Sequence, residues 1–362
     1  MKLKNLRLLN FKNHIDSRWE FNDRVNCFVG NNGSGKTNIL DAIHYLSLTK
    51  SYFNSNDSAS INFNSEFFTI KGVFENNENF SEIVCNVKEG SSKSLKNNEK
   101  KYKRFSDHIG NYPVVFISPT DTNLIYDNSD TRRKYIDSGI SQFNSVYLQN
   151  LISYNKTLKQ RNKLLKHFAI TNTFDSFTLE TYDELLIKYG EIIFYEREKY
   201  LKKLIPVFQQ YYLEISGGDE LVGIEYKSQL RENIFLKLLK KSLDKDRISS
   251  RTTVGVHKDD LLFTLNNYPI KKHGSQGQQK SFLISLKLAQ FEFMKMKLDL
   301  APVLLLDDIF DKLDDKRVEC LISFVKKEKF NQVFITDTNK ERSEDILKKT
   351  ESDYTIFNIA RS

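Results

Sequence analysis

Glycines surround a lysine and a threonine in the stretch Gly30–Thr37, which reads Gly-Asn-Asn-Gly-Ser-Gly-Lys-Thr. Glycine allows backbone conformations that are closed to residues with a Cβ, so successive N–H groups can turn toward one anion. In this pattern, the P-loop, the lysine reaches the β- and γ-phosphates of a nucleoside triphosphate and the threonine hydroxyl binds Mg²⁺. We predict these roles for Lys36 and Thr37. The predicted ATP site also includes the rest of the loop: Gly30, Asn31, Asn32, Gly33, Ser34 and Gly35.

Two adjacent acids, Asp307 and Asp308, follow the apolar run Val303–Leu306. Four apolar residues predict a buried strand, and an acid at its tip can hold Mg²⁺, directly or through water. We predict that role for Asp307. For Asp308 we predict the role of general base or water-orienting group in attack on the γ-phosphate, so Lys36 and Asp308 are the predicted catalytic residues. The alternative is a pair of acids that caps the turn after the strand.

A second polar loop with glycines, residues 274–278, opens a strongly apolar helix. Such a loop also presents N–H groups and the positive end of a helix to an anion. Because the P-loop already cradles the triphosphate of its own chain, we expect this loop to meet the γ-phosphate held by a second copy. The predicted contacts are Ser275, Gly277 and Gln278. An ordinary helix cap made by Ser275 is the alternative.

Strands and helices must bring these stretches together. Val25–Val29 predicts a buried strand before the P-loop, and apolar residues at helical spacing follow it. Strands alternate with helices again after Gly255, which implies a largely parallel sheet. Ligands of such sheets lie at the carboxyl ends of the strands, where both Gly30 and Asp307 would stand.

Two other patterns interrupt this alternation. Alternating apolar residues with Asn-rich breaks at 67–74, 81–87 and 94–105 predict an antiparallel meander, and residues 3–11 predict an edge strand. Long stretches with helical period fill residues 129–249, with a single proline, Pro206. The sequence therefore predicts an α/β core made of residues 1–118 and 250–362, with a helical arm, residues 119–249, inserted in mid-chain.

Composition narrows the class of protein. The 362 residues include 55 lysines and arginines and 47 acids, a net charge of +8, which favours a polyanionic partner such as nucleic acid. Cys27, Cys85 and Cys320 lie far apart in apolar stretches and are predicted to be reduced core thiols, with no disulfide or zinc site. No apolar run has the length of a signal peptide or a membrane span, so we predict a cytoplasmic protein.

The motifs, in this order, resemble those of the ATP-binding-cassette (ABC) ATPases of the SMC and Rad50 kind, and most closely the RecF family of bacterial recombination mediators. Residues 309–317, which come directly after Asp308, resemble the family's D-loop. Besides the three motifs above, the resemblance rests on residues 8–13, 117–119, 131–137, 160–166, 255–261, 309–317 and 332–336.

The resemblance implies an ABC-type ATPase core, a mixed sheet with flanking helices and an antiparallel β-subdomain, with the helical arm inserted into it. It implies an ATP-induced head-to-tail homodimer that uses ATP and Mg²⁺ and binds single- and double-stranded DNA. Its weak, DNA-stimulated ATPase would govern residence on DNA. With RecR and RecO, such a protein would promote RecA loading at gaps in DNA repair, replication restart and the SOS response.

Four positions depart from the family pattern. Lys12 stands where the family usually has arginine, so a bidentate contact near the phosphates becomes a point charge. Val256 replaces a proline, and Thr120 replaces an acid. Transporter ATPases of the ABC class have a switch histidine after the corresponding strand. No histidine follows Ile335 here, and Thr336 or Asp337 would take its place.

Three groups of basic residues are candidate contacts to DNA phosphates. They are Arg132, Arg133 and Lys134; Lys156, Lys159, Arg161, Lys163 and Lys166; and Lys100, Lys101, Lys103 and Arg104. Four lysines of the second group share one face of a helix, and non-specific DNA binding is carried by such charges. For each group, a solvated surface is the alternative.

The cluster His257, Asp259 and Asp260 fits a metal site less well than a hydrogen-bonded turn, because a fourth ligand is missing. Two other functions fit part of the sequence. An ATPase of an anti-phage system of the overcoming-lysogenisation type, working with a separate nuclease, would share the core. A metabolic P-loop kinase would give the loop at 274–278 no use.

Overall fold

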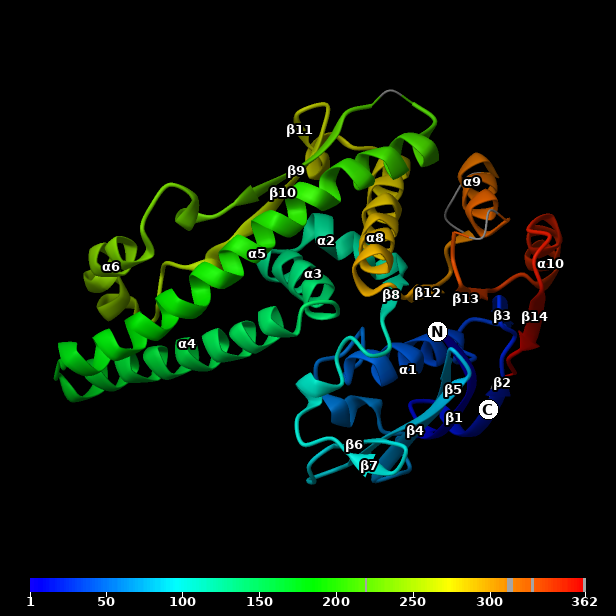
Figure 1. Ribbon diagram of the computed structural model, residues 1–362, viewed down its shortest axis with the longest axis horizontal. Coiled ribbons are helices and arrows are strands. Elements are labelled where there is room, and N and C mark those ends of the chain that lie inside the picture. Colours follow the sequence, from blue (N-terminus) through cyan, green and yellow to red (C-terminus); the bar gives the residue numbers. More distant parts are fainter. Residues whose placement is uncertain (219, 311–314, 327–328, 361–362) are drawn as a thin grey trace. The chain divides into compact units, whose positions relative to one another are not determined.

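The computed structural model describes residues 1–218, 220–310, 315–326 and 329–360 (Figure 1). The chain divides into two compact units. The first contains Met1–Thr122, Gln210–Asp219 and Ser275–Ser362, and the second contains Asn123–Gln209 and Glu220–Gly274. Residues 250–274 are therefore grouped with the inserted helices, whereas the sequence assigned them to the core. The exact boundaries of the core and the arm stay a prediction.

One sheet of the first unit is antiparallel, with the strand order β2-β1-β4-β5-β6-β7. Its strands are β1 (Lys2–Phe11), β2 (His14–Glu20), β4 (Phe67–Asn76), β5 (Asn79–Lys88), β6 (Ser94–Asn97) and β7 (Lys100–Lys101). The predicted meander is confirmed by β4 to β7. The prediction that residues 3–11 form an edge strand is wrong, because β1 pairs with β2 on one side and β4 on the other. The edge strands of this sheet are β2 and β7.

The other sheet of the first unit has the strand order β14-β3-β13-β12-β8, and every neighbouring pair is parallel. Its strands are β3 (Val25–Val29), β8 (Val114–Ile117), β12 (Val303–Leu306), β13 (Gln332–Asp337) and β14 (Tyr354–Asn358). The parallel sheet expected from alternating strands and helices is thus confirmed. Strands β3, β8, β12 and β13 are buried along their whole length, as in a sheet covered on both faces.

Four helices of the first unit are α1 (Lys36–Leu48), α8 (Gln276–Leu298), α9 (Asp315–Lys326) and α10 (Lys340–Lys349). Helix α1 contacts strands of both sheets, and it is buried on nearly all sides. Its Tyr45 ring meets Phe68 of the antiparallel sheet edge to face, at 5.5 Å between centroids. Because α1 is packed between strands of the two sheets, its position and that of the P-loop at its start are fixed.

The second unit is mainly helical. Its helices are α2 (Asn123–Tyr126), α3 (Ser129–Ser141), α4 (Ser145–Thr171), α5 (Ser176–Ser216, whose last residues belong to the first unit), α6 (Phe235–Ser249) and α7 (Ile270–His273). Three strands, β9 (Val222–Lys227), β10 (Asp260–Leu265) and β11 (Tyr268–Pro269), form an antiparallel sheet in the order β11-β10-β9. Helices α4 and α5 run side by side as a long hairpin, with Leu165, Phe168 and Leu179 packed between them (Figure 1).

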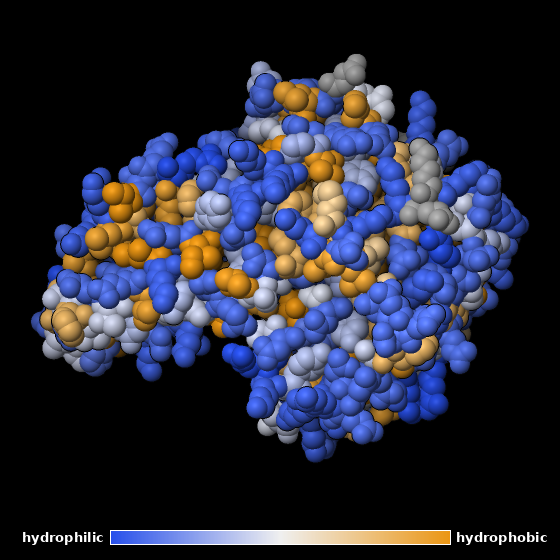
Figure 2. Space-filling view, viewed as in Figure 1, coloured by the Kyte–Doolittle hydropathy of each residue, from blue (hydrophilic) through white to orange (hydrophobic). Residues whose placement is uncertain are grey.

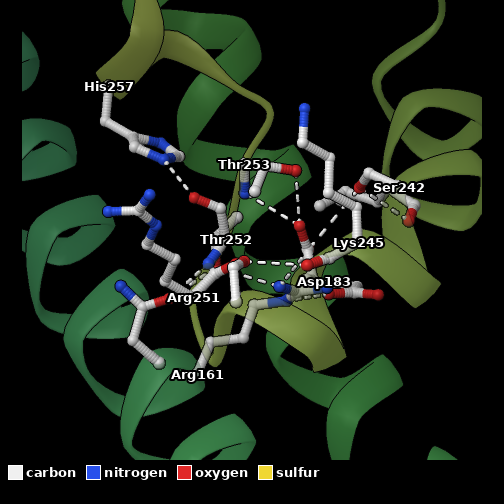
Figure 3. A network of polar contacts seen from close by, with 12 residues as sticks. Arg161, Asp183, Ser242, Lys245, Arg251, Thr252, Thr253 and His257 are labelled. Atoms are coloured by element: carbon white, nitrogen blue, oxygen red, sulfur yellow. Dashed lines mark hydrogen bonds and ion pairs between the residues drawn. The ribbon is translucent and has the colours of Figure 1, made fainter.

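A buried network of charges joins three helices of the second unit (Figure 3). Arg161 on α4 has no exposed surface, and it donates to Asp183 on α5 at 2.6 Å and to Asp246 on α6 at 2.7 Å. It also donates to the hydroxyl of Thr252 at 2.9 Å. The prediction that Arg161 contacts DNA is therefore wrong, because this side chain faces the interior and is held by two carboxylates.

Replacing Arg161 with methionine is expected to lower the free energy of unfolding by about 3 kcal/mol, because Asp246 would stay buried without its cation. Urea unfolding followed by circular dichroism measures this change. The same change at Arg231, whose ion pair with Glu198 is exposed, is the matched control and is expected to lower stability by less than about 1 kcal/mol. Equal losses in the two variants would mean that the network adds nothing.

Two of the three cysteines are core thiols as predicted. Cys27 and Cys85 are buried, and burial raises the pKa of each thiol to about 12. Cys320 on α9 is only partly buried, so the prediction of a core position is wrong for this residue. All three are free.

Candidate nucleotide-binding site

The P-loop follows the buried strand β3 and leads directly into α1, the order of elements that the sequence predicts. Gly35 is the N-cap of α1, with a φ of 107° that residues with a side chain rarely adopt. A Cβ at Gly35 would stand 2.5 Å from Nδ2 of Asn13 and 2.7 Å from Nε2 of His14. Gly35 is therefore required both by its φ and by the side chains that press on it.

Asn13 and His14, which the sequence reasoning did not assign to the site, hold the P-loop from outside. Asn13 donates to the carbonyl of Ser34 at 3.0 Å, and the ring Nε2 of His14 lies 3.1 Å from the carbonyl oxygen of Gly35. Burial lowers the pKa of His14, which favours the neutral ring. Residues 8–13 carry part of the resemblance to the family, but only the fold shows that Asn13, at the end of this stretch, contacts the loop.

Two groups of the loop are suited to an anion. The Lys36 ammonium, which is almost fully buried, donates to the carbonyls of Gly30 at 2.8 Å and Asn31 at 3.1 Å. The Ser34 hydroxyl is also buried, and no described residue is its hydrogen-bond partner. A buried hydroxyl without a hydrogen-bond partner is unfavourable unless a bound ligand forms that hydrogen bond. These groups fit the phosphates of a nucleotide.

The acid at the tip of β12 meets the threonine of the P-loop. Oδ1 of Asp307 accepts hydrogen bonds from the hydroxyls of Thr37 and Thr336, each at 2.8 Å. Burial raises the pKa of the Asp307 carboxyl above its ordinary value, while the two hydroxyls oppose this shift and the Asp308 carboxylate adds to it. A buried carboxylate of this kind is stabilised by a nearby cation.

Asp308 occupies a left-handed backbone conformation with a φ of 45°. Its amide donates to the Thr336 hydroxyl at 2.9 Å, so Thr336 contacts both acids. Of the two residues expected near the place of a switch histidine, Thr336 is therefore the one that faces the acids. Asp337 instead accepts from the Ser343 hydroxyl at 2.8 Å and pairs with Arg342.

Lys12 lies beside the P-loop helix and is held by a buried acid that the sequence reasoning missed. Its ammonium stands 2.6 Å from Asp41 Oδ2. Asp41 has no exposed surface, and it also accepts from the Ser51 hydroxyl and the Tyr52 amide, each at 2.7 Å. A polar residue in the middle of an apolar helix was the available signal. This ion pair holds the Lys12 side chain against α1.

The second glycine loop begins α8, and the structure contains the cap that the sequence offered as the alternative. Ser275 is exposed, and its hydroxyl accepts from the Gln278 amide at 3.2 Å while the Gln278 side chain accepts from the Ser275 amide at 2.7 Å. Among the described residues, no hydrogen bond joins Ser275 to the P-loop of its own chain. Gly277 lies against Arg317 of α9, whose guanidinium would stand 3.3 Å from a Cβ there.

A buried lysine, Lys287, ties α8 to the rest of the first unit. Its ammonium lies 2.8 Å from Asp121 Oδ1, and it donates to the Tyr52 hydroxyl at 2.9 Å and to the Phe116 carbonyl at 3.0 Å. Both charged side chains are nearly fully buried. Since Tyr52 also binds Asp41 through its amide, polar contacts connect the helix after the second loop to the helix after the P-loop.

Several residues predicted to contact DNA already form hydrogen bonds or ion pairs within the protein. Arg132 donates to Asp260 at 2.6 Å, and Arg133 donates to the Asp259 carbonyl at 2.8 Å; both side chains are mostly buried. Lys134 is exposed and pairs with Asp130 at 2.6 Å. The remaining candidates are exposed: Lys100, Lys101, Lys103, Arg104, Lys156, Lys159, Lys163 and Lys166. Their roles stay predictions.

The stretch His257–Asp260 forms the predicted hydrogen-bonded turn. His257 contacts the Tyr154 hydroxyl at 2.8 Å and the Thr252 carbonyl at 3.1 Å, and burial lowers its pKa to about 4. Asp259 is paired with Arg197 at 3.0 Å. In the described part of the chain, no cluster of histidine, cysteine and acidic residues could hold a metal ion.

The structure describes the predicted D-loop motif only in part. Residues 311–314 of the D-loop motif lie outside the described residues, and the motif is described only at its two ends.

None of the helices in the described part of the chain has the length and apolar character needed to cross a membrane.

Comparisons with known proteins agree over the whole chain. The model of the RecF/RecN/SMC N-terminal domain family matches residues 2–358. The DNA replication and repair protein RecF of Flavobacterium johnsoniae is 50% identical over 359 residues, which cover 99% of this chain and 100% of the relative. The protein of the same name from Bacteroides thetaiotaomicron is 45% identical over 361 residues, with 99% and 97% covered.

Solved structures give the same answer. Two structures of the recombination mediator protein RecF in the RecFOR pathway, one with ATPrS and one with ATP, both have a TM-score of 0.86, at 33% and 34% identity. They cover 98% and 94% of this chain, and this chain covers 95% and 92% of them. An Smc head domain from Pyrococcus furiosus, with a TM-score of 0.57 at 18% identity over 99% of this chain and 94% of its own, shares the fold. The predicted fold class is confirmed, and the chain belongs to the RecF/RecN/SMC N-terminal domain family and, within it, to the RecF proteins of DNA replication and repair.

Proposed function

We propose that this chain is an ATP-dependent DNA-binding protein of recombinational repair and replication restart. Two copies would close head to tail around two ATP molecules and release DNA after slow hydrolysis. The observation that carries the proposal is the hydrogen bond between Thr37 and Asp307, because it joins the P-loop to the acid of β12 in one site. The RecF relatives of the RecFOR pathway, one solved with ATP, support it.

The site fits Mg²⁺ as well as a nucleotide. The hydroxyl of Thr37 and the carboxylate of Asp307 are oxygen donors 2.8 Å apart, and Mg²⁺ prefers oxygen ligands. We propose that these two residues hold the ion, which when bound neutralises charge on the phosphates. Burial that raises the pKa of Asp307 would be relieved by a cation at this carboxylate.

The chain's own residues would then act on the nucleotide in three ways. Lys36 would leave the carbonyls of Gly30 and Asn31 for the β- and γ-phosphates, and the buried Ser34 hydroxyl would donate to a phosphate oxygen. Asp308 would orient a water molecule or accept its proton during attack on the γ-phosphate. The turn at Asn13 and His14 keeps the loop in shape during these steps.

The loop that opens α8 would complete the site of the second copy. Its serine is exposed on the end of a long helix, where amides and the helix dipole favour an anion. We propose that Ser275, Gly277 and Gln278 contact the γ-phosphate bound by the partner's P-loop. The capping hydrogen bonds do not oppose this, because they order the loop before it meets the partner.

Replacing Ser275 with arginine is expected to abolish ATP-dependent dimerisation while leaving ATP affinity of the monomer within about threefold of the wild type. A bulky cation would fill the contact between the copies, whereas no described hydrogen bond joins Ser275 to the P-loop of its own chain. Sedimentation velocity with ATP and nucleotide titration measure the two effects. Ser275→Ala is the control, because it removes the same cap, worth about 1 kcal/mol, without adding bulk. A dimer in the arginine variant would contradict the assignment.

DNA and the other recombination proteins are the proposed partners: single- and double-stranded DNA, RecR, RecO and RecA. None of the relatives named above is described as an anti-phage ATPase, so that alternative receives no support. The deciding experiment is sedimentation with ATP or with ADP, each with and without a gapped duplex. A dimer that forms with ATP and binds the duplex more tightly than the ADP form is expected. Equal DNA affinity with the two nucleotides would contradict the proposed function.

A further inference from the structure

We propose that one face of helix α4 holds the phosphate backbone of DNA, independently of the nucleotide. This surface, the α4 lysine face, consists of Lys156, Lys159, Lys163 and Lys166, all of which are exposed. The proposal rests on the function proposed above, because it names where the second unit would touch DNA. This group differs from the other basic candidates of the second unit in its exposure and in the absence of described ion pairs.

The α4 lysine face points away from the interior of the second unit. At about 100° per residue, its four members fall within an arc of about 80° on the helix. The buried residues of α4 that lie nearest to them in sequence, Tyr154, Thr157, Arg161 and Leu165, are centred on the opposite side. Leu165 packs against Leu179 of α5 and Arg161 binds acids of α5 and α6, so the lysines are turned toward solvent.

The α4 lysine face is not neutralised by acids. Helix α4 has 27 residues and contains no aspartate or glutamate, so none of its lysines has an acid three or four positions away within the helix. No ion pair joins any of these four lysines to another residue in the described part of the chain. By contrast, Lys199 on the neighbouring helix α5 lies 3.6 Å from Glu196. Uncompensated cations on one face favour a polyanion.

Other candidates of the second unit lack this property. Arg161 is buried with Asp183 and Asp246, and Arg132 is paired with Asp260. Lys134 is exposed but pairs with Asp130 on its own helix. On the face drawn in Figure 2, apolar residues gather on the second unit, and its lower edge, where Figure 1 draws α4, carries a mixture of hydrophilic and neutral residues.

The spacing of the lysines favours nucleic acid over an acidic protein. Ten residues of helix, from Lys156 to Lys166, span about 15 Å at 1.5 Å per residue. One strand of a duplex carries a phosphate about every 3.4 Å along the axis, so this length matches about four phosphates. The exposed residues of α4 include no phenylalanine, tyrosine or tryptophan on which a base could stack. Contacts would therefore be to the backbone and independent of base sequence.

The test is a variant of the full chain in which the four lysines become glutamine: Lys156→Gln, Lys159→Gln, Lys163→Gln and Lys166→Gln. Its control removes the same charge from exposed lysines of the acid-bearing helix α5: Lys188→Gln, Lys199→Gln, Lys202→Gln and Lys203→Gln. Binding to a fluorescent gapped duplex is measured between 50 and 300 mM salt, with ATP and with ADP. ATP-dependent sedimentation and ATPase activity without DNA are measured in parallel.

The α4 variant is expected to lose at least about tenfold in DNA affinity with either nucleotide. Its plot of log affinity against log salt should become less steep, with the magnitude of the negative slope smaller by about 3. The α5 control, and the dimerisation and DNA-free ATPase of both variants, should stay at the wild-type level. Wild-type affinity in the α4 variant, or an equal loss in the control, would overturn the α4 assignment. Failure of the wild-type chain to bind DNA would instead overturn the proposed function.

Discussion

An Asp308→Asn chain is expected to form the ATP dimer yet to hydrolyse ATP on the order of 100-fold more slowly. Asparagine keeps the size of the side chain but is a poor base, so water activation is lost while the phosphate-binding groups remain. Asparagine also tolerates the left-handed conformation that Asp308 adopts, with a φ of 45°, better than most residues do. The amide contact with Thr336 should therefore persist.

Single-turnover hydrolysis and sedimentation with ATP test this expectation. The ATP dimer of Asp308→Asn should outlast that of the wild type, and DNA should stay bound for longer. Thr336→Ser is a useful companion, because it keeps the hydroxyl that contacts both acids and should turn over at nearly the wild-type rate. Hydrolysis at the normal rate in the asparagine variant would remove Asp308 from the proposed role.

Replacing Lys36 with alanine is expected to abolish nucleotide-dependent dimerisation and to weaken ATP binding on the order of 10- to 100-fold, because charge-assisted contacts to the phosphates are lost. Asp307→Ala should prevent the dimer as well, since it removes the carboxylate that joins Thr37 and Thr336. Nucleotide titration and sedimentation measure both effects.

The control for Lys36→Ala is Lys96→Ala, which removes the same charge from an exposed position on β6. This control should bind ATP and dimerise normally. Because Lys36 is almost fully buried, unfolding of each variant must be measured alongside. A folded Lys36→Ala chain that still forms the ATP dimer would show that the P-loop is not where the nucleotide acts.

Local sequence patterns were sufficient for much of the core. Val25–Val29 is a run of buried residues because parallel strands are covered on both faces, and such runs are visible without a structure. The P-loop was recognisable because its backbone conformation requires glycine at positions such as Gly35, which has a φ of 107°. The meander was also visible, because its strands pair with their neighbours in sequence.

Long-range pairing was the part that local patterns did not reveal. Strand β1 looked like an edge strand, because nothing near it in sequence indicates that β4 pairs on its second side. The acids Asp41 and Asp121 become significant only when the fold brings Lys12 and Lys287 to them. A buried ion pair leaves no periodic pattern, because its partners come from separate elements.

Arg161 is different, because its burial was visible in the spacing. It shares the helical period of Tyr154, Thr157 and Leu165, which are buried, and it departs from that of the four exposed lysines around it. Grouping it with them by charge alone was the error. The periodicity of α4 would have separated the residue that binds Asp183 and Asp246 from those that face solvent.

The neighbours of β3 have a consequence for how the protein is made. Val25 pairs with Val333 on one side and Tyr354 on the other, so the strand that supports the P-loop has no sheet partner until more than 300 further residues, from 25 to 333, have been synthesised. Such distant pairing slows folding, because a long stretch of chain must be closed first. Until β13 (Gln332–Asp337) and β14 (Tyr354–Asn358) have left the ribosome, β3 is thus an apolar strand without its sheet partners, and the loop that follows it lacks this support.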